Sequence, residues 1–495
     1  MKTTGFNSGR CTTLLTDLYQ LTMACGYWKS DSHHKEAVFN LFFRKQPFGG
    51  GFTIASGLQD AIEYLETLSF GEDELAYLAT LQGNDGTALF EPGFLKYLKE
   101  LEWSFEVEAV PEGTVVFPHE PLLRIRGPII QCQIVETALL NLLNFQSLIA
   151  TKAARVCLAA QGDPVFEFGL RRAQGVDGAL AASRAAYVGG CVATSNVLAG
   201  KLFGIPVKGT HAHSWVMSFD SEEEAFDAYA DALPNNAVLL VDTYDTLQGV
   251  RKAIATGRRL KAKGHALTGI RLDSGDLAYL SIQTRLLLNE AGFTDTKIVA
   301  SNDLDEQTIV SLKQQGAAID VWGVGTKLVT AYDQPALGGV YKLAAIREQG
   351  GQWQPRIKLS EQAAKTSNPG IQQVRRFRDK TGFIGDMIYN EDGSQEAGIV
   401  IVDPLDPTRR KRMGANLESE DLLIPVFRNG KLIYEIPPLE ETRERVRVQL
   451  GSLNEGHKRF LHPHEYPVGL SPALHELRLR LILEARGEEL IKSAA

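Results

Sequence analysis

Short apolar, β-branched runs alternate with helical patterns through the middle of the chain. Seven such runs begin at residues 164, 205, 237, 267, 297, 320 and 338. Strands that alternate with helices predict a parallel sheet, and several such units can close into a (β/α) barrel. We therefore predict an α/β fold in which residues 136–350 form the catalytic domain, an irregular barrel of about seven strands.

The regions on either side have mixed patterns. Residues 1–135 combine helical stretches with strand-like "AVFNLFFR" and predict an N-terminal α/β domain. Residues 351–440 break often and then become strand-like, with a hairpin turn at Asn429 and Gly430, which predicts a small β-rich domain. Residues 441–495 contain the amphipathic stretch "HELRLRLILEARGEELIKSA" and predict a helical tail that packs back on the body.

Composition and charge narrow the class of protein. The 495 residues are 44% hydrophobic and 23% charged, as in a globular protein with more than one domain. A net charge of −8 provides no basic surface, so we expect no nucleic acid and no membrane as partners. The N-terminal stretch lacks a secretory apolar segment, and no apolar run reaches the roughly 18 residues of a membrane span, so we expect a cytoplasmic protein. Five scattered cysteines without CxxC spacing indicate reduced thiols.

Polar or glycine residues end almost every apolar run of the middle region. These endings are "GLRRAQG", "GTHAHS", "DTYDT", "RLDSGD", "SND" and "GVGT". The carboxyl ends of barrel strands build the active site, so Arg, His, Asp and Ser at successive ends predict a catalytic rim rather than ordinary turns.

The stretch "GIRLDSGDLAYL" places Arg271 and Asp273 on one face of its strand. If the apolar neighbours face the helices, both charged side chains point inward. A guanidinium can bind an anion, while a carboxylate can accept hydrogen bonds from ribose hydroxyls or hold Mg²⁺. The alternative is a mutual salt bridge, with Ser274 and Asp276 capping the next helix.

Two later strand ends can bind phosphate. "WGVGTKL" puts Gly323, Gly325 and Thr326 between a strand and a helix, and "VASNDLDEQTI" adds Ser301 and Asn302 at a second such turn. Backbone N–H groups and the positive end of a helix can hold a phosphate there. The alternative is that these residues serve only as turns and caps.

The end of the first run contributes two arginines and an aromatic ring. Arg171 and Arg172 can clamp a diphosphate or a carboxylate if they face the same rim, although such a pair is often surface. Phe168 precedes them and can stack on a flat ring or belong to the core.

His211 and His213 lie two positions apart in "GTHAHSW", as a metal-binding pair can. A metal site needs further ligands, and His265 is the only other histidine between residues 164 and 350; it precedes its strand. A reactive imidazole beside phosphate-binding turns favours His213 as a nucleophile or phosphoryl carrier.

A series of ordered motifs closely resembles the nicotinate phosphoribosyltransferase family. They are "LLTDLYQLTM", "FFRKQPFGGGF", "FGLRRAQG", "SNVLAG", "GTHAHSWVMSF", "RLDSGDL", "SND", "GVGT" and "LGGVYKL". The resemblance runs from about residue 14 to 345 and more weakly to the end.

The resemblance implies a reaction and its partners. Members of this family join nicotinate to 5-phosphoribosyl 1-diphosphate, giving nicotinate mononucleotide and diphosphate for NAD biosynthesis, with ATP as co-substrate and Mg²⁺ as cofactor. It also implies a homodimer with shared active sites. The alternatives are a nicotinamide or quinolinate phosphoribosyltransferase of the same fold, or a non-catalytic relative that binds 5-phosphoribosyl 1-diphosphate.

The resemblance also assigns roles to residues. It implies that His213 is transiently phosphorylated, and it leaves His211 without a role. Together with the strand-end chemistry, it gives His213, Asp273 and Arg271 as catalytic residues, with Asp273 as a possible Mg²⁺ ligand. The expected nicotinate contacts are Tyr19, Phe168, Thr210 and Arg271. The expected contacts to 5-phosphoribosyl 1-diphosphate are Arg171, Arg172, Ser301, Asn302, Gly323, Gly325 and Thr326.

Overall fold

The chain forms two compact units. The computed structural model describes residues 13–362, 365–393, 400–414 and 416–488. The first unit is built on Ile149–Pro335, and the second combines the chain up to Leu148 with the chain from Ala336 onward. Each domain predicted with boundaries near residues 135, 350 and 440 is one continuous stretch of the chain. The second unit instead joins two stretches, one that ends at Leu148 and one that begins at Ala336.

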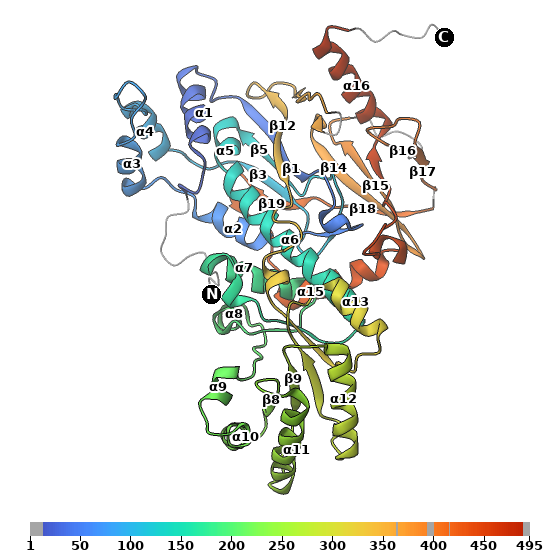
Figure 1. Ribbon diagram of the computed structural model, residues 1–495. Coiled ribbons are helices and arrows are strands. Elements are labelled where there is room, and N and C mark those ends of the chain that lie inside the picture. The colour runs from blue at the N-terminus through green and yellow to red at the C-terminus, as the bar shows by residue number, and fades with distance from the viewer. Residues whose placement is uncertain (1–12, 363–364, 394–399, 415, 489–495) are drawn as a thin grey trace. The chain divides into compact units, whose positions relative to one another are not determined.

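The first unit contains a six-stranded parallel sheet in the order β7-β6-β11-β10-β9-β8. Its strands β8 and β9 are labelled in Figure 1. Its strands are β6 (Val165–Glu167), β7 (Ala193–Thr194), β8 (Val238–Leu240), β9 (Gly269–Leu272), β10 (Lys297–Ala300) and β11 (Val321–Val324). Its helices are η2 (Leu170–Arg172), α7 (Gly175–Val188), α8 (Val197–Phe203), α9 (His213–Met217), α10 (Glu222–Ala232), α11 (Thr246–Ala262), α12 (Leu277–Glu290), α13 (Glu306–Gln314) and α14 (Thr326–Val329). The predicted α/β class with a parallel sheet is confirmed.

The sheet differs in four respects from the predicted seven-stranded barrel. The run from residue 205 makes only an isolated parallel bridge, between Val207 and Thr194. The run from residue 338 forms a strand of the other unit, and the short β7 was not predicted. A closed barrel is not confirmed, because the sheet has two ends, at β7 and β8.

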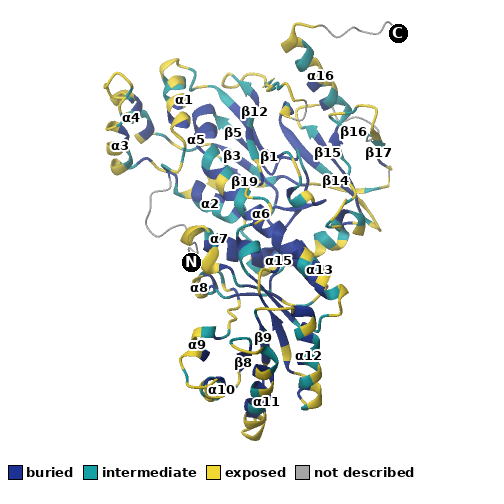
Figure 2. Cartoon of the chain, in the orientation of Figure 1, coloured by how far each residue is buried: buried dark blue, intermediate teal, exposed yellow. Residues whose placement is uncertain are grey.

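Burial explains why the apolar runs become strands. All four residues of β11 are buried, including Trp322, and Figure 2 shows such buried strands in dark blue. Aspartates then begin the helices that follow three of the strands. Asp245, Asp276 and Asp305 accept hydrogen bonds from backbone N–H groups in the first turns of α11, α12 and α13. These caps fix where each strand-end loop stops.

The second unit contains a seven-stranded sheet in the order β13-β12-β1-β5-β3-β19-β20, all of whose pairs are antiparallel. Its strands are β1 (Glu36–Phe43), β3 (Glu106–Ala109), β5 (Leu123–Pro128), β12 (Gly339–Arg347), β13 (Gln354–Pro355), β19 (Ile424–Arg428) and β20 (Lys431–Leu432). A separate pair is formed by β2 (Thr53–Ile54) and β4 (Val115–Val116). The helices of this part are α1 (Leu18–Lys29), η1 (Pro47–Gly49), α2 (Leu58–Thr67), α3 (Glu72–Ala79), α4 (Pro92–Lys99), α5 (Ile129–Ile134) and α6 (Glu136–Ala160), and α6 continues into the first unit.

Strand β12 shows why an apolar run does not identify its own sheet. It pairs along its length with β1, and the ring of Tyr341 stacks on that of Phe39 with centroids 4.9 Å apart. The predicted hairpin turn is confirmed between β19 and β20, where Asn429 and Gly430 have φ values of 49° and 69°.

A third sheet, in the order β17-β16-β21-β15-β14-β18, makes the C-terminal part of the second unit β-rich, as predicted. Its strands are β14 (Gln372–Asp379), β15 (Gly382–Asn390), β16 (Val400–Val402), β17 (Arg410–Arg412), β18 (Glu418–Asp421) and β21 (Val468–Leu470). The helices are α15 (Leu439–Ser452), η4 (Glu455–Lys458) and α16 (Pro472–Arg486). Helix α16 contacts β15, β16 and β21.

One helical stretch is apolar enough to raise the question of a membrane. By length and composition alone, residues 129–160 could cross one, which the sequence analysis did not anticipate. Two thirds of the most apolar window is buried inside the protein (67%), as in the core helix of a soluble protein. Cys132 and Cys191 are buried, Cys25 and Cys157 are partly buried, and Cys11 lies outside the described residues.

Candidate functional site

Arg271 is the centre of the candidate site. Its neighbours Ile270 and Leu272 are fully buried, so the alternation of β9 turns the guanidinium to the other face, where its side chain is 15% exposed. Nε donates to Ser301 Oγ at 2.9 Å, and Nη1 donates to Thr210 Oγ1 at 3.0 Å. Nη2 donates to Asp273 Oδ1 at 2.9 Å. One side chain therefore joins residues that follow three different apolar runs.

Asp273 shows the ion pair that the sequence left open as the alternative to a ligand role. It forms the salt bridge with Arg271, and its Oδ1 also accepts a hydrogen bond from Ser301 Oγ. Its carboxylate is 24% exposed, so a ligand can still reach it. Asp276 caps α12 as the alternative reading expected, whereas the Ser274 hydroxyl donates to Asp242 at 2.6 Å.

His213 begins the short helix α9 and contacts an acid that sequence reasoning missed. Its Nε2 lies 3.2 Å from Oδ1 of Asp242, whose side chain is only 1% exposed. Oδ2 of Asp242 accepts from Ser274 Oγ and from the backbone N–H of Asp273 at 3.0 Å. Asp242 thus connects the histidine to the Arg271 network. It is the first residue of the strand ending "DTYDT", which was predicted to lie on the catalytic rim without a role for Asp242 itself.

His211 points to a different partner. Its Nε2 accepts a hydrogen bond from the backbone N–H of Leu240 at 3.1 Å, and the residue is 7% exposed. Within the described residues, the one cluster of three possible metal ligands is Asp31, His33 and His34, which includes neither histidine of "GTHAHSW".

Phe168 lies beside the network and explains the need for a glycine at position 323. The guanidinium carbon of Arg271 is 5.9 Å from the centre of the Phe168 ring. A Cβ atom at Gly323 would lie 2.7 Å from Phe168 Cδ2, so a side chain there would displace the ring. The absence of a side chain on β11 thus leaves room for an aromatic ring at the end of β6.

The turns after β10 and β11 are joined by an ion pair. Lys327 Nζ lies 2.6 Å from Asp305 Oδ2, and this hydrogen bond raises the pKa of Lys327. Ser301 is buried, whereas Asn302 is exposed and has a φ of 106°. Gly325 precedes α14, which begins at Thr326 and has only four residues, so any phosphate contact there depends on local N–H and hydroxyl groups.

Arg171, Arg172 and Tyr19 are among the predicted residues that no hydrogen bond joins to this network. Arg171 and Arg172 are exposed on η2, directly after Phe168. Tyr19 lies on α1 of the other unit, where it is 48% exposed. Thr210, Arg271, Asp273, Ser301 and His213 are the predicted residues that hydrogen bonds bring together, with Asp242 as the added member.

Comparisons with known proteins give a consistent result over almost the whole chain. A profile described as the nicotinate phosphoribosyltransferase (NAPRTase) family matches residues 164–381. Profiles of the N-terminal and C-terminal domains of nicotinate phosphoribosyltransferase match residues 14–144 and 371–478.

Individual relatives agree with the profiles. The nicotinate phosphoribosyltransferase of Bacillus subtilis (strain 168) is 44% identical over 488 residues, which cover 96% of this chain and 98% of that protein. The human nicotinate phosphoribosyltransferase is 36% identical over 94% of this chain and 95% of its own length. A crystal structure of human nicotinic acid phosphoribosyltransferase matches with a TM-score of 0.83 and 33% identity, over 94% of this chain and 100% of that one. The chain therefore belongs to the nicotinate phosphoribosyltransferase family.

Proposed function

We propose that this chain transfers the phosphoribosyl group of 5-phosphoribosyl 1-diphosphate to nicotinate in an ATP-coupled reaction. The products are nicotinate mononucleotide, which serves NAD biosynthesis, and diphosphate. Family membership supports the transfer. The observation within the chain that carries the proposal is the Arg271 guanidinium, held at the strand ends by Thr210, Ser301 and Asp273. A planar, partly buried cation of this kind suits recognition of a carboxylate or phosphate.

Arg271, Thr210 and Phe168 are the proposed nicotinate contacts within the first unit. The guanidinium would bind the carboxylate, which nicotinamide lacks, and the Phe168 ring near it would pack on the pyridine. Tyr19 would add a contact from a neighbouring subunit in a homodimer. Such a site would prefer the charged acid because a carboxylate forms charge-assisted hydrogen bonds with the guanidinium, whereas the neutral amide cannot.

The strand ends beside Arg271 would hold 5-phosphoribosyl 1-diphosphate. Ser301 and Asn302 follow β10, Gly323 lies in β11, and Gly325 and Thr326 lead into α14. Lys327 and Asp305 link the ends of the two strands. Arg171 and Arg172 are exposed and can reach an anion that arrives at the end of β6. Local backbone N–H groups and guanidinium groups are the donors that phosphate oxygens require.

The transfer would proceed through a ribose with oxocarbenium character. The bond from the anomeric carbon to diphosphate breaks, and diphosphate keeps the electron pair. The lone pair of the pyridine nitrogen forms the new bond to the same carbon. Asp273 would accept hydrogen bonds from the ribose hydroxyls and stabilise the developing positive charge. Arg171 or Arg172 would neutralise the leaving group.

The Asp273 carboxylate fits a place in the coordination of Mg²⁺. It is partly exposed, and a carboxylate together with substrate phosphate oxygens is the ligand set that Mg²⁺ takes in phosphate chemistry. When bound, the ion would offset negative charge on the diphosphate. Asp242 is a poorer candidate because its side chain is buried and accepts hydrogen bonds from Ser274 and the Asp273 backbone.

His213 would couple ATP to this transfer. An imidazole nitrogen forms a bond to the γ-phosphorus of ATP, the bond to the ADP oxygen breaks, and water later releases phosphate from the histidine. The Asp242 carboxylate at Nε2 would orient the ring and stabilise its positive charge. Phosphorylation adds close to two negative charges near Arg271, enough to change the affinity for anionic substrates.

A substrate panel tests the proposal. The protein is incubated with 5-phosphoribosyl 1-diphosphate, ATP and Mg²⁺, and with nicotinate, nicotinamide or quinolinate, and mononucleotides are separated by chromatography. We expect product from nicotinate and at most traces from the other two. Preference for nicotinamide or quinolinate would support the related enzymes instead. Binding of 5-phosphoribosyl 1-diphosphate without any product would indicate a non-catalytic relative. A homodimer in the cytoplasm, with no nucleic acid or membrane partner, stays a prediction.

A further inference from the structure

The segment that carries both histidines runs between the two ends of the parallel sheet. At its start it pairs with the β7 end, since Thr194 N–H donates to the carbonyl of Pro206 and Lys208 N–H donates to the carbonyl of Thr194, both at 3.0 Å. At its other end it meets β8 through side chains, because Leu240 N–H donates to Nε2 of His211. In a sheet, the N–H of Leu240 would donate to a carbonyl of a neighbouring strand. Here the imidazole of His211 takes the place of that carbonyl.

The two histidines contact two residues at the end of β8 that have the same spacing as the histidines themselves. His211 binds the N–H of Leu240, and His213 binds the carboxylate of Asp242, two residues further along. Two contacts at the same spacing fix both the position and the direction of the segment against the end of β8. Thr210 lies next to the first contact and accepts a hydrogen bond from Arg271.

The hydrogen bonds of His211 define its protonation state. A ring nitrogen that accepts a hydrogen bond carries no proton, so Nε2 is the unprotonated nitrogen. Nδ1 lies 3.3 Å from the carbonyl of Ala212 and donates to it. The ring is therefore neutral, with its proton on Nδ1.

The surroundings favour this neutral form. Burial lowers the pKa of His211 below its ordinary value of 6.5, the neighbouring Arg271 of β9 and His213 of α9 add to the shift, and the hydrogen bond to the Ala212 carbonyl opposes it. On α10, the Tyr229 ring lies edge-on at a centroid distance of 4.8 Å, and the Phe226 ring lies at 6.2 Å. The group that faces Nε2 from β8 is the neutral amide of Leu240.

We propose that His211 is a positioning residue, whose neutral Nε2 anchors the segment 209–213 to β8 and thereby orients Thr210 and His213. This rests on the proposed function for its catalytic consequence, although the anchor itself can be measured without substrate. It gives His211 a role that neither the metal hypothesis nor the family resemblance supplied.

Amide hydrogen exchange at Leu240 measures the anchor directly. We compare His211→Leu, which removes the acceptor, with His211→Gln, whose side-chain oxygen can accept in its place. The matched control is His265→Leu, since the His265 ring is hydrogen-bonded to the exposed side chain of Asn235 at 2.8 Å and to no other described residue. We expect the protection factor at Leu240 to fall at least about tenfold in His211→Leu and to recover in His211→Gln and the control.

The pH dependence separates the anchor from simple packing. Because the pKa of His211 in the folded state lies below the unfolded value of 6.5, its contribution is complete above pH 6.5. It is lost as the pH falls from 6.5 toward the folded pKa, where Nε2 takes a proton and can no longer accept. Protection at Leu240 should therefore fall with acid in the wild-type protein and stay level in His211→Gln.

Kinetics test the catalytic consequence with the same variants. We expect His211→Leu to raise the KM for nicotinate and the ratio of ADP to mononucleotide, and His211→Gln to restore both.

Equal behaviour of the Leu and Gln variants, or wild-type protection that does not respond to acid, would overturn the proposal. A wild-type protein without transferase activity but with the expected exchange pattern would instead contradict the proposed function. If His211→Leu does not fold, the acid response of His211→Gln against wild type decides the question.

Discussion

At the scale of single residues, the site depends on side chains whose hydrogen bonds few other residue types could make. Arg271 uses three nitrogens for three partners, and Asp242 receives hydrogen bonds from a side-chain hydroxyl and a backbone N–H while it contacts His213. The contacts of Arg271 need a planar guanidinium, and those of Asp242 need a carboxylate with two acceptor oxygens. Conservative substitutions are therefore expected to be costly at both positions.

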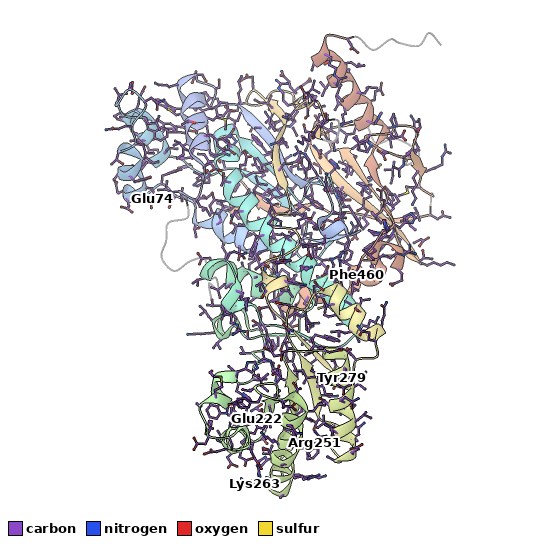
Figure 3. All side chains as sticks on the ribbon, in the orientation of Figure 1. Glu74, Glu222, Arg251, Lys263, Tyr279 and Phe460 are labelled. Carbon is purple, nitrogen blue, oxygen red and sulfur yellow. The ribbon has the colours of Figure 1, made fainter. Side chains whose placement is uncertain are left out.

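Replacing Arg271 by lysine keeps the charge and removes the fork. A lysine ammonium cannot contact Thr210, Ser301 and Asp273 in the same plane. Hydrogen bonds to charged groups contribute about 1.5–3 kcal/mol, so we expect the KM for nicotinate to rise roughly tenfold to a hundredfold in steady-state assays. The control is Arg251→Lys on α11, labelled in Figure 3, whose guanidinium contacts only the carbonyl of Leu247 at 3.4 Å among its described contacts. Similar kinetics for both variants would argue against a ligand role for Arg271.

Asp242→Asn tests the acid that the sequence analysis missed. An amide cannot balance a charged or phosphorylated imidazole at His213, so we expect mononucleotide formation with ATP to fall at least about tenfold, with a smaller effect without ATP. Asp245→Asn, three residues away, is the control because asparagine also caps helices well. An Asp242→Asn variant with full ATP stimulation would exclude a role for the carboxylate in coupling.

At the scale of elements, buried polar side chains connect the short strands and so hold the functional residues at the strand ends in place. Glu167 of β6 is fully buried and accepts hydrogen bonds from Ser183 Oγ at 2.9 Å and from Thr194 Oγ1 at 2.5 Å. It also accepts from the backbone N–H of Gly169. This carboxylate links β6, α7, β7 and the start of the loop that carries Arg171 and Arg172.

Glu167→Gln should destabilise the first unit. An amide has one acceptor oxygen, so either the hydroxyls or the Gly169 N–H lose their partner. A buried donor without a partner costs about 1–3 kcal/mol, and we expect the free energy of unfolding to fall by that amount in chemical denaturation. Glu290→Gln at the exposed end of α12 is the control and should change stability by less than about 0.5 kcal/mol. Unchanged stability in Glu167→Gln would mean that the network is not structural.

Much of the parallel sheet and its rim could be predicted because alternation and strand ends are local signals. Arg271 and Asp273 were found in this way, and hydrogen bonds do join them to Thr210 and Ser301. The two-residue strand β7 is too short to give a pattern, and the run at residue 205 forms a single bridge. The run at residue 338 looks like any other strand, because local pattern does not encode which sheet a strand joins.

At the scale of the whole molecule, segments far apart in the chain complete each other. Strand β1 pairs with β12 about three hundred residues later, and β19 pairs with β3. This is why the domains predicted along the chain differ from the two compact units. Tyr19 lies in the unit that does not contain Arg271. In the proposed site, distant segments would again combine, but the Tyr19 segment would come from a second subunit.

Subunit mixing tests the shared site. Tyr19→Ala and Arg271→Ala should each be nearly inactive. If Tyr19 serves the site of a neighbouring subunit, mixed dimers contain one site with neither substitution, and about a quarter of wild-type activity should return after exchange at equal concentrations. Activity is measured before and after the subunits exchange, and fluorescence labels confirm the exchange. No recovery in fully exchanged dimers would show that each site is contained within one chain.

The ratio of ADP to nicotinate mononucleotide tests the central claim most directly. The protein is supplied with nicotinate, 5-phosphoribosyl 1-diphosphate, Mg²⁺ and ATP, and both products are counted over time in the wild type and in His213→Ala. We predict that wild-type protein forms mononucleotide with concurrent ADP, and that His213→Ala forms mononucleotide slowly without ADP and without stimulation by ATP. ADP formation coupled to transfer in His213→Ala, or transfer in the wild type that ignores ATP, would contradict the account.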